Sequence, residues 1–234
     1  MIKAILFDLD GTLLPMDQEV FLKAYFGRLV RHLAPHGYDG DRVVRSIWEG
    51  TGAMIANNGD RTNEEVFWES FCGHFGPDAR KDEPLFERFY ETDFQKVAQV
   101  CGFDARAADA IREIKALGYR TILATNPLFP PIATQSRIRW AGLSPEDFEW
   151  VTTYDNSSFC KPNPDYYREI LAKRDLKPEE CVMVGNDVGE DMIAQKLGMQ
   201  VFLLTDCLIN KTGADICQFP HGSFPELLEF VRGL

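Results

Sequence analysis

Short apolar runs alternate along most of this chain with segments that carry an apolar stripe at helical spacing. Five runs predict strands, because they are short, rich in aliphatic residues and bounded by Gly, Pro or polar residues. They are Ala4–Phe7, Arg120–Thr125, Phe148–Thr153, Cys181–Gly185 and Gln200–Leu204. The helical patterns between them cover Ala107–Leu117, Asp165–Arg174 and Asp191–Leu197. Alternating strands and helices predict an α/β fold with a Rossmann-like, mostly parallel sheet flanked by helices.

One long stretch, residues 16–94, interrupts this alternation. It contains no convincing strand, and its aromatic residues recur at helical spacing, as in Phe21, Tyr25 and Phe26. We therefore predict two domains, an α/β core formed by residues 1–15 and 95–234 and a smaller α-helical cap domain formed by residues 16–94. The aromatic residues are interpreted as the apolar core of this inserted domain.

The first predicted strand runs directly into two carboxylates, Asp8 and Asp10. Side chains alternate along a strand, so these two point the same way while Leu9 points to the opposite face. Two unit charges about 4 Å apart repel by roughly 4 kcal/mol at an effective dielectric constant near 20. A shared proton, a splayed arrangement or a cation bound between the groups would relieve this repulsion. A solvated turn is the alternative, because Asp and Gly are ordinary turn residues.

Two later groups of polar residues also follow predicted strands or lie in the loops beyond them. Thr125 and Asn126 end the second predicted strand, where a hydroxyl and a backbone N–H could hold a phosphoryl oxygen, although Asn-Pro also favours a simple turn. Lys161 and Asn163 each precede a proline, which favours extended backbone and a stiff loop that could aim the ammonium at an anion. An exposed lysine is the alternative for Lys161.

A third group, Asp187 and Asp191, follows the predicted strand Cys181–Gly185 and is spaced by one helical turn. The pair could bind a metal ion, or Asp187 could cap a helix together with Glu190 in a capping box. Because parallel sheets bind ligands at the carboxyl ends of their strands, all these groups should share one edge. Carboxylate oxygens without His or Cys favour a hard cation, magnesium first. Together the groups suit phosphoryl transfer.

Composition and charge restrict the partners of this chain. With 45% hydrophobic and 26% charged residues, the 234-residue chain has the composition of an ordinary globular protein. Its net charge of −11 disfavours nucleic acid and anionic membranes as partners, and leaves a small anionic substrate held by locally placed cations. The six cysteines show no CxxC pairing, and the first apolar run is too short for a signal-peptide core. We therefore expect a cytoplasmic protein with reduced thiols.

The segments DLDGTL, ATN, KPNP and GNDVGED stand in the order found in the haloacid dehalogenase-like hydrolase superfamily, which this sequence resembles. The predicted helical insert stands where that family commonly carries a cap domain. The resemblance implies that Asp8 is the nucleophile and forms an aspartyl-phosphate intermediate. It also implies that Asp10 protonates the leaving oxygen and then activates water. Thr125 and the Asn126 amide would hold the phosphoryl oxygens, and Lys161 would neutralise charge between nucleophile and phosphate.

The same resemblance implies a magnesium site. Asp8 and Asp187 would bind Mg²⁺ together with the backbone carbonyl of Asp10, while Asp191 would bind the ion or orient its waters. The sequence departs from the family pattern at Asn186, where many relatives carry an acid directly after the Gly. The ligand set of this last motif is therefore left open.

Residue types in the opening motif narrow the expected activity. Dehalogenating relatives lack the second Asp because a halide leaves without a proton, and phosphonate-cleaving relatives also replace it, so Asp10 argues against both. We expect a magnesium-dependent hydrolase of small phosphomonoesters that acts on a small phosphorylated metabolite. The alternative is a sugar phosphomutase of the same superfamily, which shares every motif. A non-catalytic phospho-signalling or binding protein is a further alternative.

Overall fold

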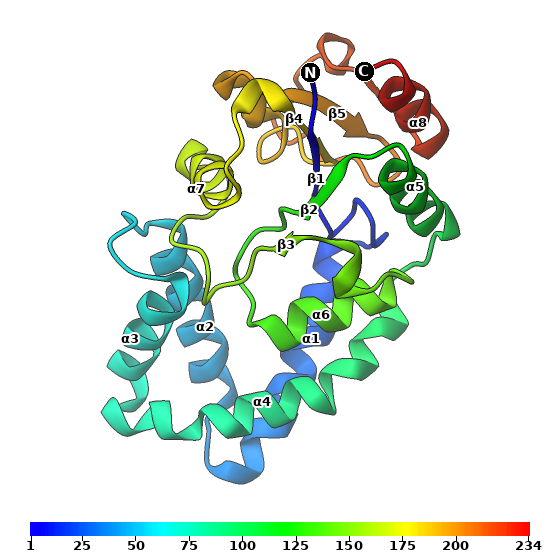
Figure 1. Ribbon diagram of the computed structural model, residues 1–234. Coiled ribbons are helices and arrows are strands. Elements are labelled where there is room, and N and C mark those ends of the chain that lie inside the picture. The colour runs from blue at the N-terminus through cyan, green and yellow to red at the C-terminus, as the bar shows by residue number, and fades with distance from the viewer.

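A computed structural model describes all 234 residues and contains one six-stranded sheet (Figure 1). The strand order is β3-β2-β1-β4-β5-β6, and every neighbouring pair is parallel. The strands are β1 (Ala4–Phe7), β2 (Arg120–Leu123), β3 (Trp150–Val151), β4 (Cys181–Gly185), β5 (Gln200–Leu204) and β6 (His221–Gly222). This is the predicted α/β, Rossmann-like fold class, which is confirmed.

Strand β1 lies at the centre of the sheet. Phe7, its last residue, pairs with Leu123 of β2 on one side and with Val184 of β4 on the other. All four residues of β1 are fully buried, as expected for a parallel strand covered on both faces. Residues that follow β1, β2 and β4 therefore emerge next to one another at the carboxyl edge of the sheet.

Helices cover both faces of the sheet. Helices α5 (Ala105–Ala116), α6 (Pro131–Trp140) and α8 (Phe224–Arg232) share one apolar cluster with the β1 side chains Ile5 and Phe7. Helix α7 (Pro164–Arg174) packs against the opposite face, where Ala4 and Leu6 lie, and Figure 1 shows it across the sheet from α5 and α8. Short 3₁₀ helices complete the chain: Ala34–His36, Pro77–Asp82, Phe94–Val100, Pro145–Asp147, Pro178–Glu180, Met192–Leu197 and Ile216–Gln218.

The chain between β1 and α5 is helical and lies beyond the carboxyl edge of the sheet (Figure 1). It forms α1 (Gln18–Leu33), α2 (Gly40–Ile55), α3 (Asn63–Phe75) and α4 (Glu83–Glu91). Side-chain caps fix two of the helix starts, because Asp17 accepts hydrogen bonds from the first turn of α1 and Thr62 forms a capping box with Glu65 at α3. The four helices share a separate apolar cluster that includes Phe21 and Tyr25 and continues past residue 94 to Val97.

The two ends of this helical segment meet. The Gly102 N–H donates a hydrogen bond to the Pro15 carbonyl at 2.7 Å. A Cβ on Gly102 would lie 2.9 Å from the Pro15 Cβ and 3.2 Å from its carbonyl oxygen, so the close approach requires glycine. The chain thus leaves the sheet layer and returns to it at nearly the same point.

Several element boundaries differ from those expected. The strand predicted over Phe148–Thr153 is reduced to the two residues that pair with β2, because beyond them the Asn156 side chain binds the Val151 carbonyl and the Thr153 N–H in a turn. The helix predicted over Asp191–Leu197 is a 3₁₀ helix that begins at Met192 and ends, as expected, before Gly198. Helices α6 and α8 and strand β6 were not predicted from the sequence. No helix in the structure is both long and apolar enough to cross a membrane.

Candidate active site

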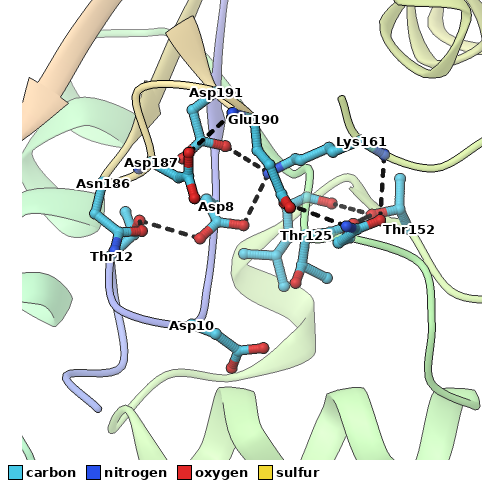
Figure 2. A network of polar contacts seen from close by, with 12 residues as sticks. Asp8, Asp10, Thr12, Thr125, Thr152, Lys161, Asn186, Asp187, Glu190 and Asp191 are labelled. Atoms are coloured by element: carbon cyan, nitrogen blue, oxygen red, sulfur yellow. Dashed lines mark hydrogen bonds and ion pairs between the residues drawn. The ribbon is translucent and has the colours of Figure 1, made fainter. Parts of the chain in front are cut away.

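Asp8 follows β1 directly, and Lys161 reaches it from the loop before α7 (Figure 2). The Lys161 Nζ lies 2.9 Å from Asp8 Oδ1 and 2.7 Å from Asp191 Oδ1. Because the Lys161 side chain is only 1% exposed, the alternative of an exposed lysine is wrong. Burial favours the neutral amine, but the charges of Asp191 and Asp8 outweigh it and raise the pKa of Lys161 well above its ordinary value. Lys161 is therefore a buried cation in contact with Asp8, the predicted nucleophile.

The second oxygen of Asp8 contacts a residue that the sequence analysis did not single out. The Thr12 hydroxyl lies 3.1 Å from Asp8 Oδ2 and 3.0 Å from Asn186 Oδ1. The Asn186 amide in turn donates to the Cys207 carbonyl at 2.7 Å. Gly11, at φ +85°, packs against the same amide, and a Cβ there would lie 2.4 Å from Asn186 Nδ2. Asn186 therefore holds the loop after β1 against the loop after β5.

Asp10 points away from the Asp8 network, toward the helices (Figure 2). Its Oδ2 forms an ion pair with Arg137 of α6, while its buried Oδ1 has no hydrogen-bond partner. The Arg137 side chain is 1% exposed, and its guanidinium carbon lies 4.4 Å from the centre of the Phe129 ring. Burial raises the pKa of Asp10 despite the opposing charge of Arg137, and the neighbouring Asp8 raises it further. The two acids of the opening motif thus have different environments.

Thr125 and Asn126 lie just beyond β2, which ends at Leu123 and not at Thr125 as predicted. The Thr125 carbonyl accepts hydrogen bonds from the Thr152 hydroxyl at 2.6 Å and the Tyr166 hydroxyl at 2.8 Å, which fix the backbone. The Thr125 hydroxyl makes no hydrogen bond within the protein and is free to bind a ligand. The Asn126 side chain accepts from the Lys161 backbone N–H at 3.2 Å and donates to Glu190 at 3.2 Å. Asn126 therefore positions the loop that carries Lys161.

Asp187 and Asp191 follow β4 and contact each other through the backbone. Asp187 Oδ1 accepts hydrogen bonds from the backbone N–H groups of Gly189 and Glu190 at 2.7 and 3.0 Å, a turn-capping arrangement, whereas its Oδ2 accepts none. Asp191 Oδ2 accepts from the Asp187 N–H at 2.9 Å. A Cβ on Gly185 would lie 2.1 Å from Asp191 Oδ2, so this position requires glycine. Burial and the nearby Asp8 charge raise the pKa of Asp191, against the opposing Lys161 ammonium.

The donor set fits a magnesium ion. No three His, Cys, Asp or Glu side chains converge to form a metal site by themselves. Magnesium, however, is usually bound by one or two carboxylates, with waters and substrate phosphates completing its coordination. Asp187, whose Oδ2 accepts no hydrogen bond, extends its carboxylate toward Asp8 (Figure 2). Both oxygens of Asp191 already accept hydrogen bonds, so Asp191 suits a positioning role.

One cavity of about 770 Å³ joins these residues. Its lining includes the predicted residues Asp8, Asp10, Thr125, Asn126, Asp187 and Asp191. Lys161 lies just behind this wall, in contact with Asp8 and Asp191. The rest of the lining is contributed mainly by the helical segment and by the loop between β2 and α6.

A buried Lys–Asp cluster on the carboxyl edge of a parallel sheet, open to a cavity under helices, is the arrangement of an α/β enzyme. The chain belongs to the haloacid dehalogenase-like hydrolase family, whose model matches residues 2–197. The resemblance seen in the sequence motifs is thereby confirmed.

Two curated relatives illustrate the range of this similarity. The pyrophosphatase PpaX of Bacillus velezensis is 25% identical over 198 residues, which cover 84% of this chain and 80% of the relative. The glyceraldehyde 3-phosphate phosphatase of Methanothermobacter thermautotrophicus is 26% identical over 231 residues, covering 92% and 94% of the two chains.

Solved structures share the fold over the whole chain. A 2-haloacid dehalogenase from Pseudomonas syringae matches with a TM-score of 0.65 and 20% identity over 100% of both chains. A HAD phosphatase from Thermococcus onnurineus matches with a TM-score of 0.60 and 21% identity over 99% of both. At this identity the likeness establishes the architecture alone.

Proposed function

We propose that this protein is a magnesium-dependent phosphatase of small phosphomonoesters that acts through an aspartyl-phosphate on Asp8. The observation that carries the proposal is the position of the Asp8 carboxylate, held between Lys161 Nζ and the Thr12 hydroxyl in the wall of a cavity. Family membership and the phosphatase names of the two curated relatives support it.

In the first step a carboxylate oxygen of Asp8 attacks the phosphorus, and the bond between phosphorus and the leaving oxygen breaks. Lys161 lowers the negative charge that accumulates between Asp8 and the incoming phosphoryl group. The free Thr125 hydroxyl and the Asn126 backbone N–H donate to the phosphoryl oxygens. Asp10 gives its proton to the leaving alkoxide, a role that suits a partly buried carboxyl whose pKa is raised.

In the second step water attacks the phosphorus of the aspartyl-phosphate and releases inorganic phosphate and Asp8. The ionised Asp10 accepts the proton of this water, so it acts as an acid in one step and a base in the next. Arg137 stabilises the ionised form needed in the second step. Arg137 thus favours the ionised form of Asp10, and burial favours the protonated form.

The carboxylates of Asp8 and Asp187 and the Asp10 carbonyl would hold the magnesium ion, and Asp191 would position Asp187 and Lys161. The ion supplies positive charge that stabilises the negative charge developing on the phosphoryl oxygens. We further propose that residues 16–94 act as a cap domain over the cavity, and that the protein is cytoplasmic. All six cysteines are free thiols, which suits a reducing compartment.

The proposal is tested by phosphate release from a panel of phosphomonoesters with added Mg²⁺, with the products identified to detect isomerisation. Asp8→Asn is expected to abolish turnover and to keep the fold, because an amide oxygen still accepts from Thr12 and Lys161 still pairs with Asp191. Asp165→Asn, at an exposed surface ion pair, is the matched control and should keep full activity. Full activity in Asp8→Asn would exclude Asp8 as the nucleophile.

A chelator should abolish the activity, and added Mg²⁺ should restore it. A second readout is independent of catalysis: Mg²⁺ should raise the unfolding temperature of the protein, because it binds only the folded state. The shift should disappear in Asp187→Asn and persist in Asp165→Asn. An unchanged Mg²⁺ shift in Asp187→Asn would remove Asp187 from the metal site.

A further inference from the structure

The helical segment contributes an apolar, aromatic wall to the cavity. Its lining side chains include Phe21, Tyr25, Ile47, Trp48, Phe67 and Trp68. Two rings of α1, those of Phe21 and Tyr25, lie edge-on to Phe129 of the β2–α6 loop at centroid distances of 6.4 and 5.6 Å. The aromatic wall is therefore continuous from the helical segment to the loop that follows Asn126. Such a surface suits an apolar ring far better than a small polar group.

Part of this wall is exposed although it is apolar. Trp48 and Ile55 are 50% and 48% exposed, and both line the cavity from α2. Thr51 lies between them at spacings of three and four residues, so the three side chains share one helix face. Together with the aromatic wall they extend the apolar surface of the cavity to its edge, where an apolar part of a ligand can bind.

Most charged side chains that line the cavity are acidic. Lys211 is the only Lys or Arg among the lining residues, whereas α3 and α4 contribute Glu64, Glu83 and Glu87. Arg80 offers no free cation to a ligand, because it pairs with Glu64 at 2.5 Å and with Glu83 at 3.2 Å. Its guanidinium is also stacked over the Trp68 ring at 4.8 Å.

Glu87 differs from its two neighbours because it forms no ion pair. On the side of the cavity formed by α3 and α4, a second anionic group of the substrate would therefore meet carboxylates and no basic partner. An ammonium or an uncharged ring would meet no such repulsion.

We propose, resting on the phosphatase function above, that the substrate is a phosphomonoester of a bulky aromatic alcohol that carries no negative charge beyond its phosphate. The phosphoryl group binds at Asp8 and Lys161, the ring binds against Trp48 and the aromatic wall, and the far end faces Glu87. Glu87 excludes carboxylates and phosphates from this end and accepts an ammonium group.

Three matched benzyl phosphates test the proposal: the unsubstituted ester, the para-aminomethyl ester and the para-carboxyl ester. All three release benzylic alcohols, and phosphoglycolate serves as a small anionic comparison. The first two should have kcat/KM values at least tenfold above those of the para-carboxyl ester and of phosphoglycolate. Equal kcat/KM values for the three benzyl esters, or a higher value for phosphoglycolate, would overturn this inference but not the proposed phosphatase function. Absence of phosphate release from all esters would instead overturn the proposed function.

A charge-reversal variant tests whether the charge of Glu87 itself selects the substrate. Glu87→Lys should raise kcat/KM for the para-carboxyl ester at least tenfold and lower it for the para-aminomethyl ester. Glu91→Lys, on the same helix α4 but outside the cavity lining, is the matched control and should change neither value. If both variants act alike, the charge at Glu87 does not select the substrate.

Removal of the exposed ring tests the apolar part. Trp48→Ala should raise KM for the unsubstituted benzyl ester at least fivefold while leaving kcat/KM for phosphoglycolate within twofold. Phe103→Ala removes an exposed ring outside the cavity lining, 66% exposed, and should leave both esters unchanged. Equal losses for the benzyl ester and phosphoglycolate in Trp48→Ala would overturn the role of Trp48.

Discussion

Arg137 forms an ion pair with Asp10 although 127 residues separate them in the chain. The arginine is buried, comes from α6 and lies over the Phe129 ring, so its position is fixed by packing. It binds one oxygen of Asp10 and leaves the other without a partner. The pair therefore orients Asp10 and also sets how readily Asp10 ionises.

Arg137→Met is expected to move the acidic limb of the kcat–pH profile to higher pH. The Arg137 charge lowers the pKa of Asp10, so its removal raises that pKa, and the proposed step that needs ionised Asp10 then requires a higher pH. An arginine beside an aspartate typically changes its pKa by about 1–3 units. Arg137→Lys, which keeps the charge, should shift the limb less.

Arg139→Met is the matched control for this experiment, because Arg139 is exposed on the same helix. It should leave the profile unchanged. If the kcat–pH profile of Arg137→Met superimposes on that of the parent protein, Arg137 does not set the pKa of Asp10.

Lys161→Met should destabilise the protein by about 3–5 kcal/mol in the absence of Mg²⁺, because it leaves Asp8 and Asp191 buried without their cation. Adding Asp191→Asn should restore part of this loss, since one uncompensated charge is then removed. Urea unfolding of the parent, both single variants and the double variant measures the coupling. Strictly additive effects would contradict a direct charge interaction between Lys161 and Asp191.

Asn186→Asp should destabilise the protein by about 1–3 kcal/mol, although many relatives carry an acid here, because a carboxylate cannot donate to the partly buried Cys207 carbonyl. Gln195→Glu, which adds a charge at an exposed site, should change the free energy of unfolding by less than about 0.5 kcal/mol. Equal stability of Asn186→Asp and the parent protein in urea unfolding would mean that the Cys207 carbonyl finds another donor.

Glu149 provides a pH-dependent contribution to stability away from the site. Hydrogen bonds from Arg120 and Arg174 lower its pKa from the ordinary value to about 2, against a smaller opposing effect of burial. A lowered pKa means that the stabilisation is complete near neutral pH and is lost as pH falls from about 4.5 toward about 2. Glu149→Gln should therefore lower the free energy of unfolding at pH 7 by about 0.5–1 kcal/mol.

The difference between Glu149→Gln and the parent protein should narrow as the pH of the urea titration is lowered from 7 to 3.5. Asp109→Asn, at a pair whose side chains are 75% and 65% exposed, should have little effect at either pH. A difference that stays constant with pH would show that the loss comes from packing.

The sequence predicted most of the sheet because parallel strands are short, apolar and bounded by turn residues. Asp8, Thr125 and Asp187 follow three neighbouring strands, so the rule that ligands bind at the carboxyl edge was enough to expect them together. Their roles in catalysis remain predictions. The departure at Asn186 was visible in the sequence, but its contacts with Thr12 and the Cys207 carbonyl depend on tertiary packing.

Arg137 could not be found in the same way. The buried face of α6 carries small and polar residues such as Ala133 and Ser136, so no apolar stripe marked the helix. The contact with Asp10 arises only when α6 packs under the carboxyl edge. The contact between Thr12 and Asp8 could have been predicted, because Thr12 follows Asp8 closely in the DLDGT sequence.

The hydrogen bond between Gly102 and Pro15 has an evolutionary consequence. Because the chain departs and re-enters at adjacent points, the segment between them is joined covalently to the sheet layer at one place, and Asn63 and Glu64 add backbone hydrogen bonds to the Ser157 and Tyr154 carbonyls. Recombination at these two points would exchange the helical segment between relatives without changing the pairing of the strands in the sheet. Such an exchange would replace much of the cavity wall and leave in place the residues that follow β1, β2 and β4.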